Sequence, residues 1–275
     1  MVVQHNLSAA NTNRQLGITT SGLQKSTEKL SSGYKINRAA DDAAGLSISE
    51  KMRNQIRGLN KASDNAQDGI SLVQTAEGAL NEVHSMLQRM SELSVQAANG
   101  TNDATDRSSI NDEVQQLKTE IQRVGSTTQF NKMNILDGTF STGANKLLQV
   151  GANANQTIQI DIDALKSVVG SSLDTNLTTA TATNAQSAIT VVQNSIEKLS
   201  KLRSKLGAVQ NRLEHTVANL DNISENTQSS ESRIRDTDMA EEMVQYSKNN
   251  ILQQAGQSML AQANQANQGV LSLLQ

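Results

Sequence analysis

Residues 56–90 read IRGLNKASDNAQDGISLVQTAEGALNEVHSMLQRM, and their apolar residues recur every three or four positions. The a and d positions of this heptad pattern hold Ile56, Leu59, Ala66, Ile70, Val73, Leu80 and Leu87, with Ala62, Ala76, Val83, Met90 and Ala97 beside them. Residues 44–98 contain no Pro and only four Gly. The pattern therefore predicts one helix of about 80 Å, at about 1.5 Å per residue, which is far longer than an ordinary globular helix.

Two further helices are predicted downstream. The shorter one ends at Gly125 and carries Ile110, Val114, Leu117, Ile121 and Val124. The longer one covers about 186–230 and ends near Ser229–Ser230. Its apolar stripe consists of Val192, Leu199, Leu202, Leu206, Val209, Leu213, Leu220 and Ile223.

The segment between these helices changes character. Residues 128–163 hold Asp137–Gly138 and further Gly and Asn turn signals between short apolar runs. Ile158, Ile160 and Ile162 alternate strictly, as in a half-buried strand. We expect one or two β-hairpins here, followed by a Ser/Thr/Ala-rich connector at 170–187.

Each end of the chain carries a predicted helical arm. A short charged segment that interrupts the helical pattern, here called a break, separates each arm from the rest of the chain. The N-terminal seam of Leu16, Thr20, Leu23, Thr27 and Leu30 ends at Gly33, a residue suited to the left-handed position after a helix. The next helix begins after an N-cap at Asp41 or Asp42, or at a capping box of Ser47 and Glu50. Near the other end, Asp238 and Glu241 give a second cap signal. The C-terminal stripe that follows consists of Met239, Met243, Leu252, Met259, Ala266, Val270 and Leu273.

The two breaks lie at similar distances from the two ends, so they meet at one level if the arms pair. We therefore predict a mainly α fold: a long antiparallel helical bundle or coiled-coil rod with a small β-hairpin element, whose terminal helices pair. At the breaks, Arg38, Asp41 and Asp42 are expected to lie where Arg233, Arg235 and Asp236 can meet them, within one chain or across to a neighbour.

Composition favours self-association over an enzyme. The 275 residues include no Pro, Cys or Trp, only two Phe and two Tyr, and 36% hydrophobic residues, so little can be buried in one thick core. His5, His84 and His215 are widely separated, and we find no metal-ligand spacing, nucleophile motif or phosphate loop. We expect no catalytic residues, no metal and no cofactor.

Charge and hydropathy limit the partners and the location. A formal charge of −3 gives no reason to expect nucleic acid or an acidic membrane surface as partner. No segment approaches the roughly 18 consecutive apolar residues of a membrane span. The N-terminus lacks the basic and apolar regions of a cleaved secretory signal, which leaves a cytoplasmic protein or export by another route.

Four segments resemble bacterial flagellins: INRAADDAAGLSIS (36–49), LQRMSELSVQAAN (87–99), TQFNKMNILDG (128–138) and ILQQAGQSMLAQANQANQGVLSLLQ (251–275). The resemblance covers nearly the whole chain. Flagellins commonly carry variable outer domains in the middle, where 164–187 has room only for a connector. The chain thus resembles a minimal flagellin with the filament-core domains alone.

The resemblance implies a secreted, extracellular protein of the bacterial flagellum, which serves motility and is exported unfolded by the flagellar type III apparatus. Such chains polymerise with one another beneath a cap, and their terminal arms become ordered in an inner coiled-coil tube. The implied partners are the flagellar cap and hook-junction proteins and an export chaperone at the C-terminal arm. Inner-tube packing is expected from Leu16, Leu23, Leu30, Leu252, Met259, Val270 and Leu273.

Five regions follow from this resemblance. They are an inner-tube arm (1–43), an outer-tube part with two helices and β-hairpins (44–163), a connector (164–187), a long outer-tube helix (188–234) and a second inner-tube arm (235–275).

Flagellins are also ligands of Toll-like receptor five, and the matching positions are Arg89, Leu93 and Glu113. Two alternatives stay open at this point: a hook–filament junction protein, which shares the arms and the export route, and a cytoplasmic coiled-coil scaffold.

Overall fold

The computed structural model describes residues 6–140, 146–170 and 178–273, with the side chains of the last helix described as far as Gln265. The chain divides into two units, one of Met1–Gln55 with Glu225–Gln275 (unit 1) and one of Ile56–Ser224 (unit 2). Long helices dominate both units, and two small antiparallel strand pairs lie in unit 2, which confirms the predicted fold class.

Three long helices build most of unit 2: α2 (Ala43–Ala98), α3 (Ala104–Thr127) and α5 (Ala182–Arg235). The single helix predicted over 44–98 is confirmed. Its heptad residues from Val73 onward pack with α3 and α5 into one core, in which Leu80, Leu87, Val114, Leu199 and Leu206 have no exposed surface. Nearer the start of α2, Leu59, Ala62 and Ala66 belong to two smaller clusters that include residues of α5. The helices can be long and thin because each buries only this stripe.

Two short β-hairpins accompany these helices in unit 2. Strand β1 (Gln129–Phe130) pairs with β2 (Met133–Asn134), and β3 (Leu147–Gln149) pairs with β4 (Thr157–Gln159), both antiparallel. Asn131 and Lys132 join β1 to β2 with positive φ angles of 48° and 63°, as a tight primed turn requires.

The predicted alternation of isoleucines is confirmed as a burial pattern, although the paired strand is short. Ile158, Ile160 and Ile162 are all buried, but β4 ends at Gln159. A short π-helical turn, η1 (Lys166–Gly170), follows this region.

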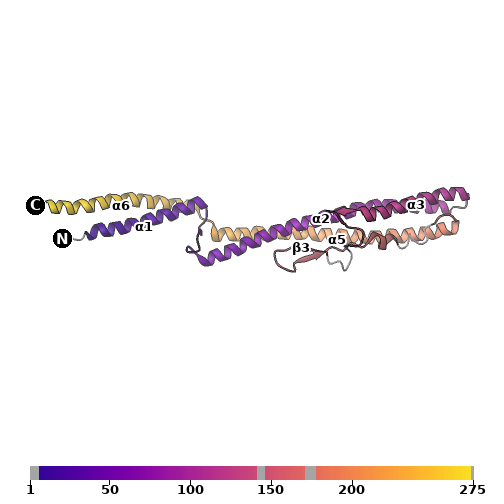
Figure 1. Ribbon diagram of the computed structural model, residues 1–275, viewed down its shortest axis with the longest axis horizontal. Helices are drawn as coiled ribbons and strands as arrows, with labels where there is room; N and C mark the ends of the chain where they lie inside the picture. Colours follow the sequence, from indigo (N-terminus) through magenta and orange to yellow (C-terminus); the bar gives the residue numbers. More distant parts are fainter. Residues whose placement is uncertain (1–5, 141–145, 171–177, 274–275) are drawn as a thin grey trace. The chain divides into compact units, whose positions relative to one another are not determined.

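In unit 1, α1 (Leu7–Ser32) and α6 (Met239–Leu273) lie side by side and run antiparallel (Figure 1). Gly33 ends α1 with a φ of 75°, and its N–H donates to the carbonyl of Lys29 at 2.8 Å, as predicted. Asp238 caps α6, since its carboxylate accepts from the backbone N–H groups of Ala240 and Glu241.

The helix boundaries correct three expectations. Helix α5 continues through Ser229–Ser230 to Arg235, because the Ser230 hydroxyl donates to the carbonyl of Asn226 at 2.9 Å and tolerates a helix interior. Helix α3 likewise passes Gly125 and ends at Thr127. Helix α5 begins at Ala182, within the expected connector, whose residues 171–177 lie outside the described residues.

The structure shows which of the three predicted N-cap signals begins α2. Asp42 is the N-cap, because its carboxylate accepts from the N–H of Gly45 at 2.9 Å. Ser47 and Glu50 lie inside the helix. Asp41 serves the preceding loop, as described below.

Candidate assembly interface

The paired helices α1 and α6 bury little of their apolar surface against each other. Leu16, Leu23 and Leu30 are half-buried, and the buried residue of α1 is Ser26. The helices approach closely where Gly256 faces Leu16, since a Cβ added to Gly256 would lie 3.2 Å from a methyl carbon of Leu16. This pairing therefore uses one narrow seam of each helix.

The other faces of the two helices carry large apolar side chains in solvent. The exposed set on α1 and α6 consists of Leu7, Ile18, Met239, Met243, Val244, Ile251, Leu252 and Met259. Of the seven residues predicted to pack in an inner tube, Leu252 and Met259 belong to this exposed set. The side chains of Val270 and Leu273 lie outside the described residues. Large apolar side chains that stay exposed along two paired helices indicate an interaction surface.

The two charged breaks of the chain meet in unit 1, where main-chain hydrogen bonds join them. The N–H of Lys35 donates to the carbonyl of Arg235 at 2.6 Å, and the N–H of Thr237 donates to the carbonyl of Gly33 at 3.0 Å. Tyr34 and Asp236 form an antiparallel bridge between them. We call residues 33–42 together with 231–238 the joint.

Side chains also stabilise the joint, through one aromatic ring and four charged groups. The guanidinium groups of Arg235 and Arg53 lie 4.8 Å and 5.7 Å from the centre of the Tyr34 ring. Arg235 also pairs with Glu50, and Arg53 pairs with the buried Glu231 at 3.3 Å. The two cations thus offset the two carboxylates, which matters most for Arg235 and Glu231, the least exposed of the four.

Of the six residues predicted at the joint, Arg235 is the one whose side chain takes part in this network in the described contacts. Arg38 pairs with Glu28 at 2.9 Å, and Arg233 donates to the hydroxyl of Ser230 at 3.1 Å. Asp236 contributes its main chain to the bridge with Tyr34.

The two acidic residues of the joint have local partners. Asp42 caps α2, whereas Asp41 accepts from the backbone N–H groups of Arg38 at 3.0 Å and Asn37 at 3.4 Å. The hydrogen bond from Arg38 is the main cause that lowers the pKa of Asp41. The two breaks are therefore joined through their main chains, but the side chains expected to meet across the joint have other partners in the described contacts.

Sequence reasoning missed Tyr34, Arg53 and Glu231 as members of this network. A usable signal existed for Tyr34, because it is one of only two tyrosines and lies inside the first break. The roles of Arg53 and Glu231 depend on the register between α2 and α5, which composition does not reveal.

The receptor-contact candidates lie in unit 2, where α2 passes α3. Arg89 pairs with Glu113 of α3 at 3.0 Å and with Glu92 of its own helix at 3.3 Å. Both Arg89 and Glu113 are exposed, but Leu93 is only 1% exposed and packs in the core. The expectation that Leu93 offers a surface contact is therefore corrected, because its side chain fills the interior between the helices.

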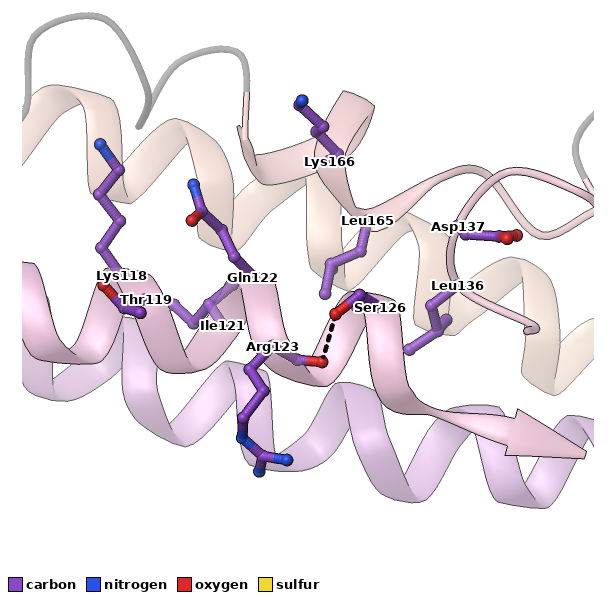
Figure 2. A pocket seen from close by; sticks show the side chains of 11 residues that line it. Lys118, Thr119, Ile121, Gln122, Arg123, Ser126, Leu136, Asp137, Leu165 and Lys166 are labelled. Carbon is purple, nitrogen blue, oxygen red and sulfur yellow. Dashed lines mark hydrogen bonds between the residues drawn. The ribbon is translucent and has the colours of Figure 1, made fainter.

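An apolar groove of about 610 Å³ lies at the C-terminal end of α3 in unit 2 (Figure 2). Its floor consists of Ile121, Leu136 and Leu165, while Lys118 and Lys166 lie at its rim. No sequence pattern indicated this groove, because its walls come from three separate segments.

The described residues offer no sign of metal chemistry or of a membrane span. They contain no group of three or more His, Cys, Asp or Glu side chains placed to hold a metal ion. Within the same residues, no helix is both long and apolar enough to cross a membrane. His84 lies on α2 and His215 on α5, and His5 falls outside the described part.

Comparison with known proteins gives matches along most of the chain. Residues 3–141 match the bacterial flagellin N-terminal helical region, and residues 189–274 match the bacterial flagellin C-terminal helical region. A flagellin of Halalkalibacterium halodurans is 57% identical over 100% of both chains, and a flagellin of Bacillus subtilis is 51% identical, also over 100% of both. Among solved structures, the crystal structure of Bacillus cereus flagellin aligns with a TM-score of 0.51 and 33% identity, over 57% of this chain and 88% of that one.

Proposed function

Because the chain belongs to the bacterial flagellin family and is a structural subunit of the extracellular flagellar filament, we propose that its terminal helices complete their packing only against further copies of the same chain. This family assignment replaces both alternatives, the hook–filament junction protein and the cytoplasmic scaffold. Flagellin is a structural protein family, in keeping with the expectation that the chain is not an enzyme.

The exposed large apolar side chains on α1 and α6 are the observation that carries the proposal. Ile18, Ile251 and Met259 stand in solvent in the single chain, although burying each such side chain is worth about 1.5–3 kcal/mol. Neighbouring copies that cover these residues would supply the apolar contact that the α1–α6 pair lacks. In the filament, the arms 1–43 and 235–275 then form the inner tube, and 44–163 with 188–234 form the outer tube.

These exposed apolar side chains need protection before assembly. We propose that an export chaperone covers the C-terminal arm, and that the cap and hook-junction proteins meet the ends of the filament through these helices. Unpaired, the arms bury too little to offset their conformational entropy, so we expect them to be the least stable part of the free chain.

Seeded extension tests the assembly proposal. Full-length chains added to sheared filament seeds should extend them, as seen by electron microscopy, while chains lacking 1–42 should not. Limited proteolysis of the free chain should remove roughly 40 residues from each end before it cuts unit 2. Failure of the intact chain to extend seeds, or protease-resistant ends, would count against the proposal.

A second proposed activity is recognition by Toll-like receptor five. The exposed Arg89–Glu113 pair supports it, because two helices hold a guanidinium fork and a carboxylate at one place on the surface. In reporter cells that carry the receptor, Arg89→Ala and Glu113→Ala should each weaken activation. Lys61→Ala, which removes an exposed cation elsewhere on α2, serves as the control.

A further inference from the structure

We propose that Asn99 is a site of self-modification, at which the backbone nitrogen of Gly100 attacks the Asn99 side chain and its amide becomes a carboxylate. The site lies in unit 2, in the turn between α2 and α3. The reaction consumes water and uses a base from the solvent, so it proceeds in the free chain without a partner.

The dipeptide Asn-Gly occurs once in the sequence, at Asn99–Gly100. Glycine hinders attack by its own backbone nitrogen least, because it carries no side chain and its backbone rotates most freely. A Cβ added to Gly100 would meet no atom within 4 Å, so the surroundings of this residue are open.

The turn leaves both reacting groups accessible. Asn99 and Gly100 are exposed, and they follow directly after Ala98, the last residue of α2. Among the hydrogen bonds of the described residues, none is donated by the N–H of Gly100 or by the side-chain amide of Asn99. The attack therefore breaks no existing hydrogen bond of either group.

Other asparagines that precede a small residue are held differently. Asn65, Asn184 and Asn194 lie inside α2 and α5, where the N–H that would have to attack belongs to a helix interior. Asn153 precedes Ala154 in an exposed loop, but its neighbour carries a Cβ. Asn153 is thus an internal reference for an exposed asparagine without the glycine.

Arg107 of α3 makes the attacking nitrogen more acidic. Its guanidinium donates to the carbonyl of Asn99 at 3.1 Å and to the carbonyl of Ala97 at 3.1 Å. A cation on the carbonyl oxygen withdraws electrons from the peptide bond between Asn99 and Gly100, and so stabilises the deprotonated form of its nitrogen. Because this deprotonated nitrogen is the attacking species, the contact favours the reaction.

The chemistry balances in two steps. First, a bond forms between the Gly100 nitrogen and Cγ of Asn99, the bond from Cγ to the amide nitrogen breaks, and ammonia leaves with the proton that Gly100 has lost. The product is a five-membered cyclic imide. Water then opens either of its two carbon–nitrogen bonds, which gives aspartate or isoaspartate at position 99.

Both products alter the turn. Each adds a negative charge at the C-terminal end of α2, where the helix dipole disfavours it. Isoaspartate also lengthens the backbone by one carbon, next to the carbonyls that Arg107 holds and beside Asn102, whose side chain donates to the carbonyl of Gln96 at 2.6 Å. Modification therefore loosens the contacts that direct α3 back along α2.

Incubation of the full-length chain tests the site. Peptide mapping by mass spectrometry should show Asn99 converted at least about tenfold faster than Asn153, and Gly100→Ala should slow the conversion by at least about tenfold. Thr101→Ala, which leaves the dipeptide intact, is the control. Equal rates at Asn99 and Asn153, or an unchanged rate in Gly100→Ala, would overturn the inference.

Comparison with the unfolded chain tests the part played by the turn. Asn99 should convert no more slowly in the folded chain than in urea, and Arg107→Gln should slow it about threefold in the folded chain alone. Circular dichroism confirms that each variant is folded. A folded chain slower than the unfolded one would show that the turn protects Asn99, and Arg107→Gln at the wild-type rate would remove its assistance; either result contradicts the proposal.

Discussion

In unit 2, Leu80 and Leu206 have no exposed surface, while in unit 1 Ile251 and Val244 keep 67% and 66% of theirs. Both units are built from long helices with similar apolar spacing. In unit 2, three helices and two hairpins surround the stripe, but in unit 1 the two terminal helices share one seam. Helical periodicity therefore predicts which residues form an apolar stripe, but not what covers it. In unit 2 the stripe is covered by other segments of the same unit, and in unit 1, as we propose, it is covered by another copy of the chain.

The largest contrast is expected from removing one leucine in each unit. Leu80→Ala should lower the free energy of unfolding by about 3 kcal/mol, because it leaves a cavity among fully buried neighbours. Leu252→Ala should cost less than about 1 kcal/mol in the free chain, yet impair filament formation. Urea unfolding and seeded extension measure the two effects. A large loss of monomer stability in Leu252→Ala would erase the distinction between the units.

A smaller effect on monomer stability is expected at the joint. Reversing both Asp41 and Asp42 to Lys removes the α2 cap, worth about 1 kcal/mol, and the acceptor that organises the loop. Filament yield should fall sharply while the thermal transition of unit 2 persists. Asp41→Asn with Asp42→Asn retains acceptor oxygens and is the matched control. Normal filament yield from the lysine variant would show that the joint is no more than an ordinary turn between helices.

The loop of the joint should also respond to acid. Hydrogen bonding from Arg38 lowers the pKa of Asp41 below its ordinary value of 3.8. A lowered pKa in the folded state stabilises the loop above pH 3.8, and this contribution is lost as the pH falls below that value through the folded-state pKa. NMR titration of the Asp41 carboxyl carbon should give a midpoint below 3.8, and a midpoint at or above it would contradict the structure.

The smallest effect is expected at glycines that pack against nothing. A Cβ added to Gly78 or Gly207 meets no atom within 4 Å, so Ala at either position should stabilise unit 2 by about 0.5–1 kcal/mol. Thermal unfolding measures the gain. Destabilisation by either change would mean that the backbone there is not an ordinary helix interior.

The helices could be predicted well from the sequence because their signals are local or periodic. The run 44–98, the end of α1 at Gly33 and the cap of α6 at Asp238 each depend on residues within a few positions. The end of α5 differs from the predicted one, because a serine pair is compatible both with a turn and with a helix whose carbonyls the hydroxyls can bond.

The candidate sites were predicted less completely, because they depend on contacts between distant segments. The resemblance predicts Leu93 on a contact surface, but α3 and α5 pack around α2 and bury its side chain. Arg235 and Asp41 are expected to meet residues of the other break, but their described partners are Glu50 and the backbone of Arg38, which follow from register and loop geometry. The groove beside α3 could not be predicted, because its walls come from three separate segments of the chain.

The pairing of α1 with α6 has a consequence for the order of folding. Asn6 donates to the carbonyl of Ala263 at 3.1 Å, a contact that spans 257 positions of the chain. Closing so long a loop is slow unless the intervening residues have already folded and brought the ends together. We therefore expect unit 2 to form first and the terminal pair last, so the surface that meets other copies matures only after the rest of the subunit is in place.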